Sequence, residues 1–538
     1  GHPVEALSYV KKHIGFVNFE ENECDECGNI NPDEIFKITE TKTIDEFGRA
    51  TSERKISSAD WFKLFKENQP VTTETNSAIK ISDAPKVSGK FTQYLIYLKR
   101  NLFAKLRNKQ YVAITMVEAP LLAVILAVAT RSYLPGGTYT FGGNNNIPVY
   151  IFISTIVALF LGLIVSAEEI IQDKKILKRE AFLQLSRRSY LLSKISYIIL
   201  ISAIQSFLFL LVGNLILGVR ELFFHYWLIL FATSCFAGLL GLNISSGLKT
   251  RVAVYILIPF LIIPQIMLSG AMVKFEELSP MVSSQSKVPL VGNLMTSRWA
   301  YEALAVDQFR NNSFEKPFFE FEKRMSNATY RKDWWGNVME NSIYFSEQDV
   351  ASHKVSSDSL EKMNEFFISE FSDLKKEYPA MHMKDISKMT IAHDGEKFFS
   401  VCKENLDTMK KFLIATYNDA SEKKEALMES LMSKFTSTEE YTMMKQKYFN
   451  DKLDEVVKNS LVKDKTVIDE NKIIRRFQPV FVESKSTRIY SAPFYSYSKS
   501  FFGIQLETFW FNLLMIVLMA IILYLTLYYD LLRKALEW

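Results

Sequence analysis

SAEEIIQDKKILKREAFLQLSRRSYLLSKI, residues 166–195, decides the fold because it separates two long apolar runs. The run before it, 148–165, and the run after it, 197–219, are each long enough to cross a bilayer as a helix. The stretch itself is basic, and a short basic loop between two spans stays in the cytoplasm. Apolar residues recur in it at helical spacing, which predicts an amphipathic helix lying under the membrane.

Four further apolar runs complete a membrane domain. Six apolar runs in all have the length of spanning helices. They cover about 111–130, 148–165, 197–219, 227–247, 252–273 and 509–529. Lys and Arg gather before span one, between spans two and three, between spans four and five, and after span six. We therefore expect an integral protein of the plasma or inner membrane with both termini in the cytoplasm.

The chain between spans five and six is long and largely charged. Residues 360–375 and 403–435 contain no Pro or Gly and have helical patterning. Aromatic and β-branched residues near 473–482 and 488–497 indicate short strands. We expect a large, mostly helical extracytoplasmic insertion before the last span.

The N-terminal part is soluble in character and leads into an amphipathic helix. A helix is expected over 3–14, and Ser, Thr, Pro and Lys in 69–90 suggest a linker. The predicted class is mainly α, with a six-helix transmembrane domain. Its predicted parts are 1–90 cytosolic, 91–110 amphipathic connecting helix, 111–306 spans one to five with the amphipathic helix between spans two and three and an outer re-entrant segment, 307–500 insertion, and 501–538 span six with a cytosolic C-terminus.

Composition and motifs argue against several function classes. The net charge is +4 without a long basic tract, so no nucleic-acid partner is expected. No G-x-x-x-x-G-K-[ST] motif occurs, so this chain alone is not expected to be an ATP-hydrolysing enzyme, and it shows no catalytic residues. Cys24 and Cys27 form one CxxC pair, which is a weak metal candidate beside ordinary thiols, and no metal is expected.

Polar and helix-kinking residues inside the spans are candidates for a substrate path. An ionisable residue at membrane depth, such as Glu118, is a functional candidate, although it could also pair near the cytoplasmic end. Amides in spans more often join helices than bind substrate. Prolines in span five either mark a moving helix or a static kink. The candidates are Glu118, Pro259, Pro264, Gln265 and Asn512.

The order of parts resembles the membrane half of ABC transporters of the G subfamily (the White and pleiotropic-drug-resistance type), in the type-2 permease class. The motifs that carry it are Gly1–Gly15, Asn31-Pro32-Asp33, the helix with Arg100 and Arg107, Arg179-Glu180, Ser189-Tyr190, Ser269-Gly270 and Ser297–Leu304. Asp33 stands where the family has Ala, and Glu34 where it has Asp. The resemblance covers about 1–306 and 501–538, and leaves 307–500 unexplained.

The resemblance implies a division of labour. A nucleotide-binding domain carrying ATP and Mg would lie before Gly1 or on a separate subunit, and the assembly would be a homodimer in contact with membrane lipid. The implied coupling helix contains Glu168, Glu169, Lys174, Arg179, Glu180 and Tyr190, and the connecting helix contains Arg100 and Arg107. Ion pairs among Glu168, Glu169, Arg179 and Glu180 would stiffen the coupling helix. The alternative is a charged loop that only sets topology.

Two functions remain open. The first is the permease part of an ATP-driven exporter that moves an amphipathic or lipid-like substrate, held at the midline against spans two and five. The second is a membrane-anchored binding or signalling module that works through its extracytoplasmic domain.

Overall fold

The computed structural model describes residues 3–14, 33–46, 50–68, 88–133, 139–180, 185–279, 288–352, 355–435, 437–469, 471–484 and 490–536. It divides into two compact units, Gly1–Val87 and Ser88–Trp538. The first unit contains α1 (Pro3–Ile14), α2 (Asp33–Thr39), an antiparallel pair β1 (Lys42–Ile44) and β2 (Ala50–Arg54), and α3 (Ser58–Glu67). The helix expected over 3–14 is confirmed. Most of the expected linker, 69–87, lies outside the described residues, as do Cys24 and Cys27.

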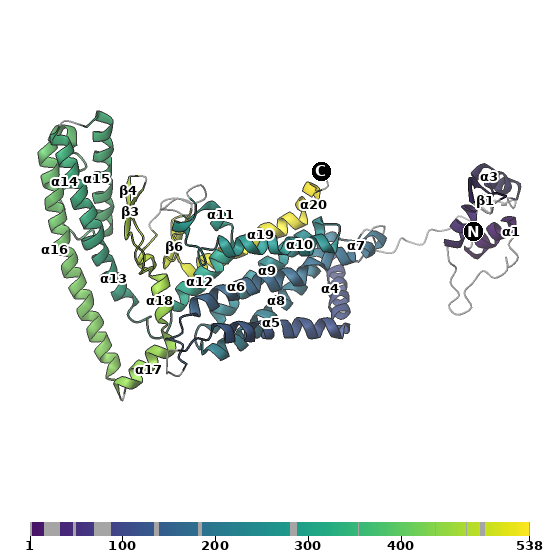
Figure 1. The fold of residues 1–538 in the computed structure, drawn as a ribbon, viewed down its shortest axis with the longest axis horizontal. Coiled ribbons are helices and arrows are strands. Elements are labelled where there is room, and N and C mark those ends of the chain that lie inside the picture. The colour runs from purple at the N-terminus through teal and green to yellow at the C-terminus, as the bar shows by residue number, and fades with distance from the viewer. Residues whose placement is uncertain are drawn as a thin grey trace. The chain divides into compact units, whose positions relative to one another are not determined.

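The second unit opens with an amphipathic helix that turns sharply into the first apolar helix. The amphipathic helix α4 (Lys90–Arg107) ends at Asn108, whose backbone leaves the helical region. The Asn108 side chain then accepts a hydrogen bond of 3.1 Å from the Tyr111 backbone and caps α5 (Lys109–Thr130). Figure 1 shows α4 at a steep angle to α5. The expected connecting helix over 91–110 therefore forms, apart from its last residues.

Apolar helices make up the bundle of the second unit (Figure 1). They are α5, α6 (Ile147–Ala167), α8 (Arg187–Leu217), α9 (Phe223–Gly247), α10 (Arg251–Met267) and α19 (Thr508–Tyr528). In the part of the chain that the structure describes, five of them are long and apolar enough to cross a membrane, and α10 is shorter. At 17 residues, α10 is about 25 Å long, against about 30 Å for a bilayer core.

Span five was expected to reach residue 273, and it ends earlier for a local reason. The helix continues through both Pro259 and Pro264, so neither proline terminates it. It stops at Met267, and Gly270 then takes a positive φ of 76°. A Cβ at Gly270 would lie 2.5 Å from the Phe275 ring, so glycine permits both the turn and the close packing.

The basic stretch 166–195 contains the expected amphipathic helix, but this helix covers only part of the stretch. The first half of the stretch is α7 (Glu169–Glu180), which follows α6 with a break only at Glu168. Its last part, from Arg187, is the beginning of the 31-residue α8. Apolar residues continue from Tyr190 into the following run, so the helix has no reason to end there.

Small residues let the central helices pack closely. A Cβ at Gly162 of α6 would lie 2.3 Å from the Ser234 carbonyl of α9, and one at Gly241 would lie 2.0 Å from the Ser166 hydroxyl. Helices in lipid gain most of their association energy from such close approach. The core of the bundle therefore sits along the contact between α6 and α9.

The bundle is closed at one end by a buried helix. After a short α11 (Leu290–Asn293) comes α12 (Thr296–Arg310), in which every residue from Thr296 to Phe309 is buried. It packs against α6, α9 and α19. The helix runs across residue 306, where the insertion was expected to begin. We call this end of the bundle the insertion end, and the end that carries α4 and α7 the α7 end.

The insertion is mostly helical, as expected, and has its own core. Its helices are α13 (Phe319–Thr329), α14 (Gly336–Ala351), α15 (Ser357–Glu377), α16 (Ile391–Met432), α17 (Thr438–Tyr448) and α18 (Asp451–Val457). A π-helical turn, Tyr330–Trp335, joins α13 to α14. Trp335, Phe367 and Phe398 lie at the centre of a core separate from that of the bundle. Figure 1 shows α13 to α16 as a helical rod beside the bundle.

Short antiparallel strands return the chain to the last span. They are β3 (Thr466–Asp469) with β4 (Lys472–Arg475), and β5 (Tyr490–Ser491), β6 (Ser498–Phe501) and β7 (Ile504–Glu507) in the order β5-β6-β7. The strands expected near 473–482 and 488–497 form only in part, because Pro479–Phe481 makes a 3-10 turn. The chain ends in α19 and α20 (Leu531–Leu536).

Candidate functional site

A buried ionic cluster joins three helices at the α7 end. The Glu169 carboxylate of α7 lies 2.5 Å from Lys105 Nζ of α4 and 2.8 Å from Lys194 Nζ of α8. Lys194 also lies 2.9 Å from Asp173, one turn further along α7. Burial alone would lower the pKa of Lys105, but the charge and hydrogen bond of Glu169, together with smaller contributions from Tyr111 and Asp173, raise it, so the ammonium stays charged. We call Lys105, Glu169, Asp173 and Lys194 the Glu169 cluster.

Aromatic side chains enclose this cluster. The Tyr190 hydroxyl donates to Asp173 at 3.0 Å, and its ring meets Tyr97 of α4 edge-on at 5.6 Å. The hydroxyls of Tyr111 and Tyr197 lie 2.7 Å apart and join α5 to α8. The three helices therefore share an apolar shell around buried charges, in which a carboxylate is stable only while it is paired.

The far end of α7 is tied to α4 by a second ion pair. Arg100 Nη1 lies 2.7 Å from Glu180 Oε1, and the Arg100 guanidinium also sits over the Tyr97 ring at 5.0 Å. Both side chains are partly exposed, so this pair contributes little to stability and mainly sets position.

The start of α7 is fastened to α9. Ser245 Oγ accepts hydrogen bonds from the Ile170 and Ile171 backbones at 3.0 and 3.1 Å, which satisfies two donors at the helix N-terminus. Lys174 Nζ donates to the Leu248 carbonyl at 2.6 Å. Side-chain contacts therefore join α7 to α4, α8 and α9.

Most of the expected coupling residues meet here, but their partners differ from those expected. Glu169 and Glu180 pair with cations of α4 and α8, and Glu168 lies 3.7 Å from Arg251 of α10. The ion pairs expected within α7 are therefore replaced by pairs between helices. Arg107 and Arg179 are exposed.

Sequence reasoning missed three members of the Glu169 cluster: Lys105, Asp173 and Lys194. Lys105 and Lys194 were counted only as topology-setting charges. The sequence did contain an indication that these two lysines are at least partly buried, because each lies one helical turn or less from residues of an apolar helix face.

The expected path residues do not form one site. Gln265 joins α10 to α12, since its side chain accepts from the Ser297 backbone at 3.0 Å and its carbonyl accepts from the Ser297 hydroxyl at 2.5 Å. Glu118 is half-buried on α5. Pro259 and Pro264 lie within α10, of which only Val254 and Ile258 are buried.

Asn512, the fifth path candidate, belongs to a second ionic cluster at the insertion end. Its side-chain oxygen accepts from Lys499 Nζ at 2.9 Å, and its amide donates to the Trp299 carbonyl at 3.0 Å and to Glu302 at 3.1 Å. Lys499 also pairs with Glu302, and all three side chains are fully buried. Burial lowers the pKa of Lys499 to about 7, against the opposing effect of Glu302.

This second cluster holds β6 and the segment before it against α12. Besides Lys499, Glu302 accepts a hydrogen bond of 2.7 Å from the Tyr495 backbone. Arg298, one turn earlier, donates to Asn293 at 2.7 Å and to the Ala492 carbonyl at 2.9 Å. We call Arg298, Glu302, Lys499 and Asn512 the Lys499 cluster. Lys499 carried no sequence signal, since it lies in a short serine-rich segment.

A third group of buried charges lies where α13 meets α16 and α18. Glu322 of α13 lies 2.7 Å from Lys424 of α16 and 3.2 Å from Lys458 of α18. Glu315 is also buried, and one of its carboxylate oxygens has no hydrogen-bond partner. Burial and the neighbouring Glu322 charge raise the pKa of Glu315 well above its usual range.

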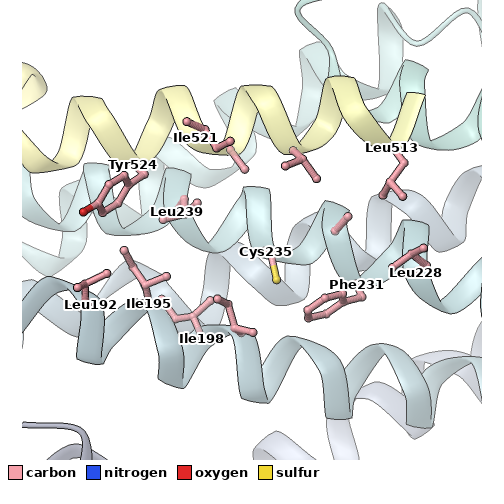
Figure 2. A pocket seen from close by; sticks show the side chains of 14 residues that line it. Leu192, Ile195, Ile198, Leu228, Phe231, Cys235, Leu239, Leu513, Ile521 and Tyr524 are labelled. Atoms are coloured by element: carbon pink, nitrogen blue, oxygen red, sulfur yellow. The ribbon is translucent and has the colours of Figure 1, made fainter. Parts of the chain in front are cut away.

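An apolar groove of about 490 Å³ lies between α8, α9 and α19. Figure 2 shows Ile195 and Ile198 of α8, Cys235 of α9 and Ile521 of α19 facing into it. Its lining is aliphatic and aromatic apart from the Cys235 thiol and the Tyr524 hydroxyl. None of the five path candidates is among the residues that line it, and neither is any residue of α6 or α10, which are spans two and five.

Within the described residues, no group of three or more His, Cys, Asp or Glu side chains could hold a metal ion. The chemistry of the three clusters is therefore that of paired charges, which hold helices in register.

One family matches part of the chain. Residues 92–306, from α4 into α12, match the family model described as ABC-2 type transporter. No curated protein matches the chain significantly. Together with the apolar helices, the match supports an integral membrane protein whose residues 92–306 are similar to the membrane domain of ABC-2 type transporters. The matched segment includes the Glu169 cluster.

Proposed function

We propose that this chain is the transmembrane half of an ATP-driven exporter with the arrangement of the G subfamily. The match over residues 92–306 supports a permease of type 2, and the order of α4, α5 and α7 supports the finer assignment. A nucleotide-binding domain, fused or separate, would bind ATP and Mg. The α7 end is cytoplasmic in this proposal, because its loops carry the excess of Lys and Arg.

The observation that carries the proposal is the Glu169 cluster. Because Glu169 is 2% exposed and bonds to both Lys105 and Lys194, separating α7 from α4 or α8 would leave a buried charge unpaired. Breaking such a pair costs about 3–5 kcal/mol. A motor that pushes on α7 would therefore move α4 and α8 with it, instead of bending α7 away.

A second copy of the chain would cover α10. Six of its apolar side chains are at least half exposed: Val252, Tyr255, Ile256, Phe260, Ile263 and Met267. We place the midline of a homodimer here, with the substrate between the two copies of α6 and α10. A Phe260→Cys change should then give a disulfide-linked dimer in membranes, and an exposed Phe103→Cys change on α4 should not.

The substrate of this exporter would be amphipathic or lipid-like. The α10 face that would border the midline is apolar, with Tyr255, Phe260 and Ile263 at least half exposed, which suits a hydrocarbon chain.

Transport and hydrolysis assays on the same preparation test the coupling role. The chain together with its ATPase is placed in inverted vesicles, and uptake of a panel of fluorescent phospholipids is measured alongside ATP hydrolysis. Glu169→Gln should lower transport more than tenfold while hydrolysis continues. Arg107→Gln, which changes an exposed residue of α4, should leave both unchanged. Equal transport by wild type and Glu169→Gln would exclude the coupling role.

A second function is favoured by one observation. The insertion has a core of its own around Trp335 and Phe367, so it could fold and act as a binding module. In that case the membrane helices are an anchor, no ATPase accompanies the chain, and ligand binding does not depend on ATP.

A further inference from the structure

A second cavity, of about 890 Å³, lies where the insertion meets the bundle. One wall comes from the turn after α10 and from α11, including Lys274, Phe275 and Leu290. The other wall comes from α18, β4, β5 and the turn between β5 and β6, including Val456, Arg475 and Phe494. We call this cavity the junction pocket. Its volume is in the range of small-molecule sites in proteins.

One side of the junction pocket is apolar and aromatic. The Phe275 and Phe494 rings meet edge-on at 5.0 Å, and Phe494 lies 4.1 Å from the Tyr495 ring. Leu290, Val456 and Val482 extend this surface. These side chains can take up the hydrocarbon part of a ligand.

The other side carries an excess of positive charge. Lys274, Lys452, Arg475 and Arg476 line the pocket, against the two acidic residues Glu276 and Glu455. Lys452 is neutralised by Glu455 at 2.8 Å. Lys274 is exposed, and its ammonium donates to the uncharged Asn459 side chain at 3.1 Å.

Arg475 adds a cation whose described hydrogen bonds all end on neutral groups. It donates to the Phe477 carbonyl at 2.6 Å, to Asn327 at 2.7 Å and to Ser326 at 2.6 Å. Burial lowers its pKa to about 10, so it remains charged at neutral pH. A partly buried cation held by neutral partners favours an incoming anion.

We propose that the junction pocket binds a single-chain amphiphile with an anionic head. The carboxylate or phosphate head would lie near Lys274 and Arg475, and the hydrocarbon tail would lie along Phe275, Phe494 and Val456. This inference does not require that the chain is an exporter, because the pocket is built by the insertion and the bundle irrespective of any motor.

Equilibrium binding of a fluorescent fatty acid tests the proposal. The full chain is placed in nanodiscs of phosphatidylcholine and titrated, without ATP, with 11-(dansylamino)undecanoic acid. The methyl ester of the same probe supplies an uncharged comparison, and inorganic phosphate as competitor reports whether the head alone is recognised. The acid should bind at least tenfold more tightly than the ester.

Two variants and a control locate the site. Lys274→Glu should weaken binding of the acid about tenfold and leave the ester unchanged. Leu290→Trp, at a position that is 83% exposed, should fill the pocket and weaken both probes without affecting folding. Lys411→Glu, which changes an exposed lysine of α16, is the matched control and should change nothing. Thermal unfolding midpoints verify that all three variants are folded.

Two results would overturn the proposal. Equal affinity for the acid and the ester would remove the anionic head from the recognition. Unchanged binding in both Lys274→Glu and Leu290→Trp would place the probe on another apolar surface, such as the groove between α8, α9 and α19. Neither result bears on ATP-driven transport, so a failure here leaves the proposed exporter function standing.

Discussion

The Glu169 carboxylate of α7 lies 2.8 Å from the Lys194 ammonium of α8, and the two side chains are only 2% and 5% exposed. Charges so deeply buried are tolerated because each neutralises the other and Lys105 completes the group. The pair joins a short amphipathic helix to a 31-residue apolar helix. Its role in holding α7 to the bundle leads to the first prediction.

Removing one partner of this pair should destabilise the protein. Lys194→Met leaves Glu169 short of one cation, and we expect a loss of about 3 kcal/mol in the free energy of unfolding. Glu169→Gln/Lys194→Met should lose less than the sum of the single variants, because each change also removes the charge that the other leaves without its partner across the contact of α7 with α8. Thermal unfolding of the purified protein in detergent measures this. Strictly additive losses would show that the two residues act independently.

The Arg100–Glu180 pair should affect coupling and leave stability nearly unchanged. Both side chains are partly exposed, so Arg100→Glu should cost no more than about 1 kcal/mol. Transport with the ATPase present should nevertheless fall, and the exchange Arg100→Glu/Glu180→Arg should restore it. Arg107→Glu, on an exposed position of the same helix, is the control. Failure of the exchange to restore transport would contradict a direct role of this pair.

The Lys499 cluster should be the most sensitive to single changes. Lys499→Met leaves the buried Glu302 carboxylate without its ammonium partner, and we expect a loss of about 3–5 kcal/mol. Lys411→Met, at an exposed position, should cost less than about 0.5 kcal/mol. Expression level and thermal midpoint report both effects. A Lys499→Met protein as stable as wild type would show that Glu302 is satisfied in another way.

The buried Glu315 should make the insertion less stable at high pH. Its pKa is raised on folding, so the folded state holds a proton that the unfolded chain loses above about pH 4.3. This contribution is complete below that pH and declines as the pH rises, on the order of 1 kcal/mol per pH unit.

Glu315→Gln imitates the protonated form and tests this assignment. The variant should be more stable than wild type at pH 8, and the difference should shrink towards pH 5. Thermal midpoints across this pH range give the comparison, with exposed Glu361→Gln on α15 as control. A constant difference at all pH values would mean that Glu315 does not titrate in this way.

The sequence alone predicts where most of the helices lie, but it does not predict which helices pack against one another. Apolar runs of about 20 residues predict spans regardless of tertiary contacts, and the helices at 3–14, 360–375 and 403–435 follow from local patterning. The end of α10 depends on a turn at Gly270 that packs against Phe275, which local patterning does not show. The division of 166–195 between α7 and α8 likewise depends on packing against α4 and α9.

The sequence predicted which segment contains the candidate site, but it did not predict which residues form ion pairs there. Glu169 and Glu180 were identified, but their partners Lys194 and Arg100 are 25 and 80 residues away along the chain. Asn512 was assigned to a substrate path because it is polar within a span. Its amide instead completes a buried cluster with Lys499, a residue without any distinguishing pattern.

The most direct test of the proposed function is ATP hydrolysis by the polypeptide isolated from its native membrane. A tag after Trp538, placed in the gene at its natural position, recovers the chain with whatever is fused to it or bound to it. We predict vanadate-sensitive hydrolysis, a P-loop segment on the same polypeptide or on a stoichiometric subunit, and lipid movement that Glu169→Gln lowers more than tenfold. A preparation with neither ATP hydrolysis nor a P-loop segment would contradict this prediction.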